Sequence, residues 1–274
     1  MKRIRLENAV IIKEVKNFSL KDTLECGQCF RWNETVDGSF EGIVEGRFCR
    51  ASQKGDTVTL SGIDPDDFDT FWCEYFDFSR DYDLLREQFG QDPTLAQALC
   101  FAPGIRVLRQ YPWETLCSYI ISQNNNIKRI KGIVARLCEA FGDPLADGSG
   151  WSFPSAERLA ALKTEDLAPI RCGFRAKYII DAATKVASGE LVLEKLYRMD
   201  LEEARTKLMT IKGVGPKVAE CTLLYGLGRV ECFPLDVWMK RAMAELFPNG
   251  LPDCAVKEAG IAQQYIFHYM RMRG

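Results

Sequence analysis

The chain has 274 residues, enough for one large domain or two ordinary ones, and its 47% hydrophobic and 27% charged residues are typical of a globular protein. Its formal net charge of −2 does not by itself indicate a nucleic-acid-binding protein. The single histidine, His268, excludes a multi-histidine zinc site and leaves carboxylates, cysteines or lysines for any chemistry.

The cellular compartment is predicted from the apolar runs and the cysteines. No run approaches the roughly 18 apolar residues of a membrane span, and charged residues between Glu7 and Lys16 interrupt any signal-peptide core. The eleven cysteines are an odd number scattered along the chain, which favours a reducing compartment over a disulfide framework. We therefore expect a cytoplasmic protein with no membrane segment.

The first 62 residues favour β-structure. Strand-like segments rich in β-branched and aromatic residues lie at 9–15, 29–35 and 57–62. The stretch 39–49 alternates with period two, so that one face of a strand would carry Phe40, Gly42, Val44, Gly46 and Phe48. Turn signals at 37–38 and 54–56 separate these segments, which predicts a twisted antiparallel sheet.

From about Pro65 onward the apolar spacing is mostly helical. Amphipathic or buried helices are predicted at 113–123, 127–142, 155–162, 176–188 and 201–211. Because strands and helices do not alternate, the predicted fold class is α+β. We expect an N-terminal antiparallel β domain at 1–76 and an α-helical region at 77–274 with two subdomains flanking a cleft.

Charge is distributed unevenly along the chain. Residues 64–87 hold nine acidic and two basic residues, whereas residues 204–241 hold seven basic and three acidic ones. This asymmetry is consistent with a local site for an anionic ligand.

The basic segment contains a glycine hairpin. A helix predicted to end near Ile211 is followed by Gly213-Val214-Gly215 and then by Pro216, a residue favoured at the first position of a new helix. Such a hairpin presents backbone N–H groups at a helix N-terminus, which can bind a phosphate without reading sequence. The dinucleotide and P-loop fingerprints both fail, because Val218 stands where they need glycine or a hydroxyl residue.

Lys217 lies in the first turn after the hairpin, and Asp236 follows nineteen residues later. Taken alone, the lysine could be a solvated surface residue and the aspartate an N-cap. Together with the hairpin they resemble the helix-hairpin-helix (HhH-GPD) DNA glycosylase superfamily, and within it the 8-oxoguanine DNA glycosylase/AP lyases. Segments that match this branch also occur in order: GQCFRW (27–32), SQNNNIKRI (122–130), GFRAKY (173–178) and IAQQYIF (261–267).

The resemblance implies a bifunctional base excision repair enzyme that removes 8-oxoguanine from duplex DNA, opposite cytosine. Lys217 would attack the sugar C1′ and form a Schiff base that permits strand cleavage by β-elimination. Because an ordinary lysine is almost fully protonated at neutral pH, the site must favour the neutral amine. Asp236 would stabilise the cationic sugar.

No cofactor is expected for this chemistry. The resemblance does imply a monovalent cation on the hairpin carbonyls when DNA is bound, and a monomer that associates with the nucleoid of a prokaryote when it binds DNA. The iron–sulfur branch of the superfamily carries four close cysteines after its aspartate, and here only Cys254 follows Asp236, so no cluster is expected.

Five further residues match the positions that bind the damaged base. The carbonyl of Gly27 would accept the proton that 8-oxoguanine, unlike guanine, carries on N7, and Gln263 would pair with the Watson–Crick edge. Phe267 and Cys221 would cover the two faces of the base, with Pro234 in the same set. The alternatives are a β-turn or bulge for Gly27 and ordinary core positions for Phe267 and Cys221.

A second set matches the residues that fill the gap left by the flipped base and bind the orphaned cytosine. It consists of Asn124, Arg129 and Arg175, with Phe174 where a tyrosine wedge is common. Residues 124–126 could instead simply break the chain between two helices.

Three rival functions remain open at this point. A non-catalytic helix-hairpin-helix DNA-binding protein needs the hairpin but has no use for Lys217, Asp236 and Gln263 together. A glycosylase for alkylated bases would work without the lysine. A thiol oxidoreductase would use the CxxC spacing of Cys26 and Cys29, which here lacks the usual βαβ context.

Overall fold

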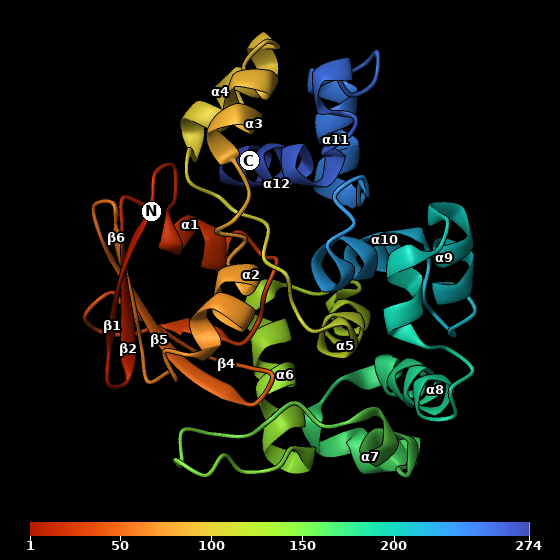
Figure 1. The fold of residues 1–274 in the computed structure, drawn as a ribbon. Coiled ribbons are helices and arrows are strands. Elements are labelled where there is room, and N and C mark those ends of the chain that lie inside the picture. The colour runs from red at the N-terminus through yellow and green to blue at the C-terminus, as the bar shows by residue number, and fades with distance from the viewer. Residues whose placement is uncertain (274) are drawn as a thin grey trace.

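The computed structural model describes residues 1–273 and has two parts, an antiparallel sheet and an array of helices packed against it (Figure 1). The sheet has six strands in the order β1-β2-β6-β5-β4-β3. The strands are β1 (Lys2–Leu6), β2 (Ala9–Lys13), β3 (Trp32–Glu34), β4 (Phe40–Val44), β5 (Arg47–Lys54) and β6 (Thr57–Ser61). All neighbouring strands pair antiparallel, which confirms the predicted α+β class with an N-terminal antiparallel sheet.

The sheet packs against helix α1 (Leu20–Glu25) and the helical turns from Phe68 to α2 (Cys73–Tyr75). Aromatic side chains dominate this core, and Trp32, Phe40, Phe68, Trp72 and Phe76 are almost completely buried. Burial of such large rings is the main source of stability for a small sheet.

Residues 39–49 were predicted to place every second side chain, from Phe40 to Phe48, on one face of a strand, and that prediction was wrong. Glu45 and Gly46 form a tight turn with φ of +48° and +75°, so the stretch contributes two strands instead of one. Before the turn Phe40 and Val44 point into the core as expected, but after it Cys49 is buried and Phe48 is only partly buried. Along a strand every second side chain faces the core. The turn at Glu45 and Gly46 therefore moves the core-facing positions from even-numbered residues before it to odd-numbered residues after it.

Two elements lie where the sequence predicted none. Strand β1 is exposed on all five residues, so it carries no apolar alternation to detect. Helix α1 is only six residues long and begins at Ser19, whose hydroxyl accepts a hydrogen bond from the Asp22 N–H at 3.2 Å.

The helical part contains ten α-helices within the described residues. They are α3 (Tyr82–Phe89), α4 (Pro93–Phe101), α5 (Pro112–Ser122), α6 (Ile127–Phe141), α7 (Ala156–Ala160), α8 (Ala176–Ala187), α9 (Leu201–Leu208), α10 (Pro216–Cys221), α11 (Val237–Leu246) and α12 (Ala259–Arg273). Five of them coincide with the predicted helices to within three residues. None of the described helices is long and apolar enough to cross a membrane.

Helix α5 is the centre of the helical core, since eight of its eleven residues are buried. It packs against α6, α8 and α10 (Figure 1). The loop after α1 also belongs to this core, because Cys26 and Phe30 are buried among helical residues rather than under the sheet. The Gln264 side-chain amide on α12 donates to the Cys26 carbonyl at 3.3 Å, which ties this loop to the last helix.

Candidate functional site

Seven residues predicted to act in catalysis or to bind the damaged base line one small cavity. The cavity is bounded by Gly27, Tyr119, Lys217, Cys221, Tyr225, Pro234, Asp236, Gln263, Gln264 and Phe267. These residues come from five separate segments: the loop after α1, helix α5, the α10 region, the loop before α11, and α12. Its volume of about 50 Å³ has room for a few water molecules, so the cavity must widen before a purine can enter.

Lys217 is positioned by the start of α10. Gly215 is the N-cap of this helix and Pro216 its first residue, so Lys217 lies at the second position of the first turn. Its Nζ donates a hydrogen bond to Ser122 Oγ at 3.1 Å and lies 4.8 Å from the centre of the Tyr119 ring. Within residues 1–273 the hydrogen-bond partner of this amine is thus a hydroxyl and not a carboxylate.

Asp236 is the N-cap of α11, and its Oδ1 accepts a hydrogen bond from the Met239 N–H at 2.8 Å. The capping role considered from sequence is therefore present, and it holds the carboxylate at the cavity wall. Capping and electrostatic catalysis are compatible, because the cap fixes where the charge lies.

Glu220 connects the segment that carries Asp236 to the helix of Lys217. Its buried carboxylate accepts a hydrogen bond from the Phe233 N–H at 2.6 Å and forms an ion pair with Arg205. Phe233 lies just before Pro234 in the loop that leads to Asp236. A shift of α10 would therefore also move this loop.

Gln263 is buried, and its amide is held from two sides. Its Nε2 donates to the Pro234 carbonyl at 3.5 Å, and its Oε1 lies 3.3 Å from the Tyr225 hydroxyl, whose single hydrogen points at the closer Gln264 Oε1. The Tyr225 hydroxyl also lies 2.6 Å from Gln264 Oε1, and its ring stacks on Tyr119 at 5.4 Å. The amide that would read a base is thus oriented before any ligand binds.

Cys221 and Phe267 line the same cavity from different helices. Burial raises the pKa of the Cys221 thiol to about 12, although the nearby Lys217 charge opposes this shift. Cys221 is therefore a neutral, apolar wall at physiological pH.

Gly27 has a φ of +93°, a conformation that L side chains rarely adopt. A Cβ at this position would lie 3.2 Å from Arg271 Nη1 and 3.2 Å from Ile127 Cδ1. The backbone conformation therefore favours glycine here, and a larger residue would also have to displace the ends of these two side chains.

The residues predicted to bind the opposite base form a second cluster outside the cavity. The Arg175 guanidinium is buried and donates from Nε to the Gln123 carbonyl at 2.9 Å and from Nη2 to the Asn124 carbonyl at 3.0 Å. Asn124 is exposed with a φ of +47°, and the half-exposed Phe174 ring lies 4.4 Å from the Arg175 guanidinium carbon. Burial lowers the pKa of Arg175. The positive charge of the nearby, exposed Arg129 lowers it further.

The hairpin has the predicted geometry at its first glycine. Gly213 has a φ of +76°, and a Cβ there would lie 2.5 Å from the Tyr178 ring. The Lys212 N–H donates to Asp181 Oδ2 at 2.8 Å, and the Val214 N–H donates to the Ile211 carbonyl at 3.0 Å. Helix α8, which carries Tyr178 and Asp181, thus holds the hairpin in place.

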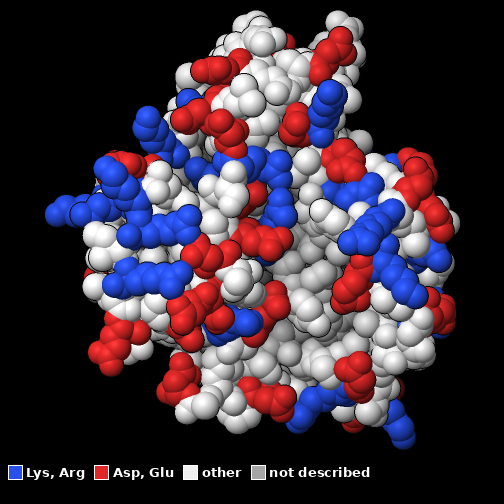
Figure 2. All heavy atoms as spheres, in the orientation of Figure 1, with Lys and Arg blue, Asp and Glu red and all other residues white. Residues whose placement is uncertain are grey.

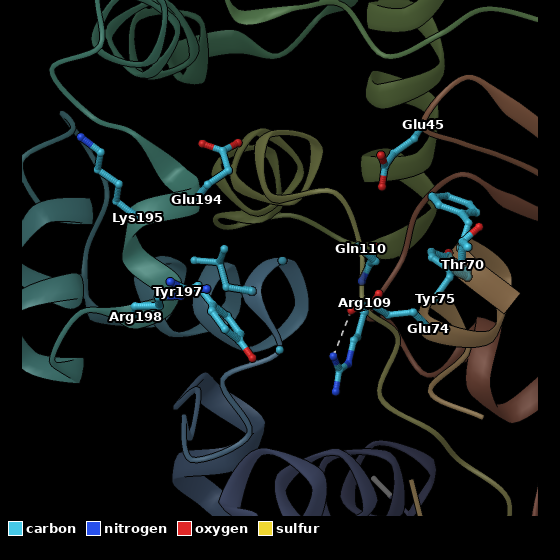
Figure 3. Close-up of a pocket in the computed structure, with 14 residues that line it drawn as sticks. Glu45, Thr70, Glu74, Tyr75, Arg109, Gln110, Glu194, Lys195, Tyr197 and Arg198 are labelled. Atoms are coloured by element: carbon cyan, nitrogen blue, oxygen red, sulfur yellow. Dashed lines mark hydrogen bonds and ion pairs between the residues drawn. The ribbon is translucent and has the colours of Figure 1, made fainter. Parts of the chain in front are cut away.

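A larger cavity of about 740 Å³ lies between the sheet and the segment Leu193–Arg198, and it contains none of the predicted site residues (Figure 3). Its wall includes Gln110, whose backbone N–H donates to the carbonyl of Tyr225, a residue that lines the small cavity, at 2.7 Å. Arg109 at its edge is paired with Glu74 at 3.1 Å. Acidic and basic side chains are intermixed on the face seen in Figure 2, so no uniform field for an anion exists there.

The thiol oxidoreductase reading does not fit the cysteines. Cys26 and Cys29 are both free and buried, and burial raises the pKa of both thiols, that of Cys26 to about 12. Reactive thiols need a lowered pKa and access to solvent. Among the described residues, no group of three or more His, Cys, Asp or Glu side chains could hold a metal ion.

The residues at or beside the cavity that sequence reasoning did not assign include Gln264, the neighbour of Gln263, and four others: Ser122, Tyr119, Tyr225 and Glu220. Tyr225 follows Lys217 and Cys221 at a spacing of four, which places it on the same helical face and could have identified it. The other three could not have been found in this way, because Ser122 and Tyr119 lie on a different helix and Glu220 acts through the backbone of a loop.

Comparison with known proteins agrees with this arrangement. Residues 10–116 match the family "8-oxoguanine DNA glycosylase, N-terminal domain", and residues 117–253 match "HhH-GPD superfamily base excision DNA repair protein". The N-glycosylase/DNA lyase of Saccharomyces cerevisiae is 32% identical over 249 residues, which cover 81% of this chain and 66% of that protein. The chain thus spans just under two thirds of the yeast relative.

Solved structures resemble the whole chain as well. The structure described as MBOgg1 in complex with a low-affinity DNA ligand is 44% identical, with a TM-score of 0.95 over 100% of this chain and 99% of that one. The Clostridium acetobutylicum 8-oxoguanine glycosylase/lyase, bound to duplex DNA with cytosine opposite 8-oxoguanine, is 34% identical with a TM-score of 0.93 over 100% and 98%. The chain therefore belongs to the HhH-GPD superfamily of base excision DNA repair proteins and carries the N-terminal domain of its 8-oxoguanine DNA glycosylases.

Proposed function

We propose that this chain is a base excision repair enzyme that removes 8-oxoguanine from duplex DNA and then cleaves the strand through a lysine imine. The observation that carries the proposal is the convergence of Lys217, Asp236, Gln263 and Gly27 on one cavity from distant parts of the chain. The names of its relatives, N-glycosylase/DNA lyase and 8-oxoguanine glycosylase/lyase, support the same reaction.

The reaction forms one bond to C1′ and breaks another. Lys217 Nζ would bond to C1′ while the bond from C1′ to the base nitrogen breaks, and the base leaves with the electron pair and takes up a proton. The amine loses its protons, and the ring oxygen leaves C1′ and takes up a proton, which gives an imine. Loss of a proton from C2′ then forms a C2′=C3′ double bond and expels the 3′ phosphate. Asp236, fixed by its cap to α11, would stabilise the positive charge that develops on the sugar.

Recognition of the lesion would use the walls of the cavity. The Gly27 carbonyl would accept the N7 proton that distinguishes 8-oxoguanine from guanine, and the oriented amide of Gln263 would pair with the Watson–Crick edge. Phe267 and the neutral thiol of Cys221 would contact the base faces.

The partner would be double-stranded DNA with cytosine opposite the lesion. Asn124 and Phe174 are exposed beside the paired cations Arg129 and Arg175, a combination suited to a gap in the duplex and an orphaned base. The hairpin at Gly213 would bind a phosphate, with a monovalent cation on its carbonyls when DNA is bound, and no cofactor would take part in the chemistry. A monomer in the cytoplasm, associated with the nucleoid when it binds DNA, completes the proposal.

Borohydride trapping on a duplex that carries one 8-oxoguanine opposite cytosine tests this function, with Lys217→Gln as the control variant. We expect a covalent complex with the native protein and none with the variant. Base release without trapping would replace the lysine mechanism with water attack. Binding without any product would favour a non-catalytic DNA-binding protein instead.

A further inference from the structure

We propose that Ser122 is a positioning residue that directs the lone pair of the Lys217 amine toward C1′. The inference deepens the proposed function, since it concerns the nucleophile of that reaction. It is carried by the hydrogen bonds around one hydroxyl at the end of α5.

The Ser122 hydroxyl has two neighbours with opposite requirements. The Tyr119 carbonyl, 2.8 Å away, can only accept a hydrogen bond, so the Ser122 hydrogen points at it. The Lys217 amine, 3.1 Å away, then meets only lone pairs of the Ser122 oxygen and must donate to it. The carbonyl thus fixes the direction of the second bond.

This direction matters for a nucleophile. A free hydroxyl could donate its hydrogen to the lone pair of a neutral amine, which would block attack. With its hydrogen bound to Tyr119, Ser122 takes one N–H of the amine and leaves the lone pair in the remaining staggered positions. A lone pair restricted to two positions before the substrate arrives removes part of the orientational cost of the reaction.

The surroundings of Ser122 and Lys217 are rigid enough to keep this geometry. Tyr119 is buried, stacks on Tyr225 at 5.4 Å and donates its hydroxyl to the Gln28 carbonyl at 3.3 Å. Its ring also lies under the Lys217 amine at 4.8 Å, on the same helix as Ser122. The amine is therefore held by two residues of α5, one turn apart.

The chain offers a matched control for a substitution at Ser122. Ser188 follows the last residue of α8, and its hydroxyl donates to the Lys185 carbonyl three residues earlier at 3.2 Å, as Ser122 does to Tyr119. Ser188 is exposed and outside the cavity. Ser188→Ala thus removes the same helix-end hydrogen bond without touching the nucleophile.

Single-turnover base release from an 8-oxoguanine:cytosine duplex, with the dissociation constant measured in parallel, tests the proposal. We expect Ser122→Ala to release the base about ten- to a hundredfold more slowly with its affinity for the duplex unchanged. Ser122→Thr, which keeps the hydroxyl, should stay within about threefold of the native rate, and Ser188→Ala should match it. A native rate in Ser122→Ala, or an equal loss in the Ala and Thr variants, would overturn the inference.

A second substrate separates this inference from the proposed function. Borohydride trapping on a duplex with a preformed abasic site needs the Lys217 amine but no damaged base. If the native protein traps this site without releasing 8-oxoguanine, the lesion assignment fails, and slower trapping by Ser122→Ala still supports the positioning role. If the native protein traps neither substrate, both proposals are overturned.

Discussion

Gly213 and Gly215 lie two residues apart in the hairpin, and the structure predicts opposite outcomes when each is replaced by alanine. At Gly213 the φ of +76° costs an alanine about 1–2 kcal/mol. The new Cβ would also lie 2.5 Å from the Tyr178 ring, and overpacking of this kind costs about 1–3 kcal/mol. Alanine also lowers the conformational entropy of the unfolded chain relative to glycine, which offsets about 0.4–1 kcal/mol of this loss. The net loss is about 2–4 kcal/mol.

Gly215 is the control. Its φ of −106° suits any residue, and a Cβ there would meet nothing within 4 Å. Alanine is a poorer N-cap than glycine by less than about 1 kcal/mol, and the entropy of the unfolded chain offsets this loss. Gly215→Ala should therefore leave the free energy of unfolding nearly unchanged.

Thermal unfolding followed by circular dichroism distinguishes the two variants. With about 2–4 °C per kcal/mol for a chain of this size, Gly213→Ala should lower the Tm by roughly 5–15 °C and Gly215→Ala by less than about 2 °C. Gly213→Ala should also bind duplex DNA more weakly, because the hairpin must move to relieve the clash. Equal Tm values for the two variants would refute the steric argument. So would a double variant with Tyr178→Ala that recovers none of the loss.

Four further predictions follow from individual contacts. Glu220→Ala should lower the free energy of unfolding by about 2–3 kcal/mol in urea denaturation, because it removes the buried ion pair with Arg205 and leaves the Phe233 N–H without its acceptor, and Glu220→Gln should lose less. Burial lowers the pKa of His268, so below about pH 6.5 the unfolded chain binds more protons than the folded one, and the free energy of unfolding should fall with pH by at most about 1.4 kcal/mol per pH unit. His268→Gln should flatten this slope, and an unchanged slope in the variant would contradict the assignment. When base release is measured with each of the four bases opposite the lesion, Arg129→Ala should show a smaller preference for cytosine than the native protein. Equal excision opposite all four bases by the native protein would refute the role of this cluster. An aromatic disulfide reagent should label the exposed Cys100 before any buried cysteine, and prior labelling of Cys26 or Cys29 would revive the redox interpretation.

The sequence by itself determined the fold class, five of the ten helices of the helical part, and seven of the residues that line the cavity. Period-3.6 patterns located α6 and α8 because each of these helices buries one face, and α5 was located by its long apolar run, since it is buried on nearly all sides. The hairpin was identifiable because glycine and proline have strong local preferences, whereas Lys217 and Asp236 were assigned from the resemblance of this segment to the glycosylase superfamily.

Only the tertiary structure decided which of these residues meet. Gly27 and Gln263 are separated by more than two hundred residues, and their meeting at one cavity depends on the loop after α1 entering the helical core and on α12 returning to it. Three other features have no signature in the spacing of apolar residues. They are the hydroxyl that faces the Lys217 amine, the carboxylate that ties α10 to the loop before Asp236, and the turn at Glu45 that shifts the sheet register. Periodicity reports which face of an element is buried, whereas contacts between side chains far apart in sequence are set by how the elements pack.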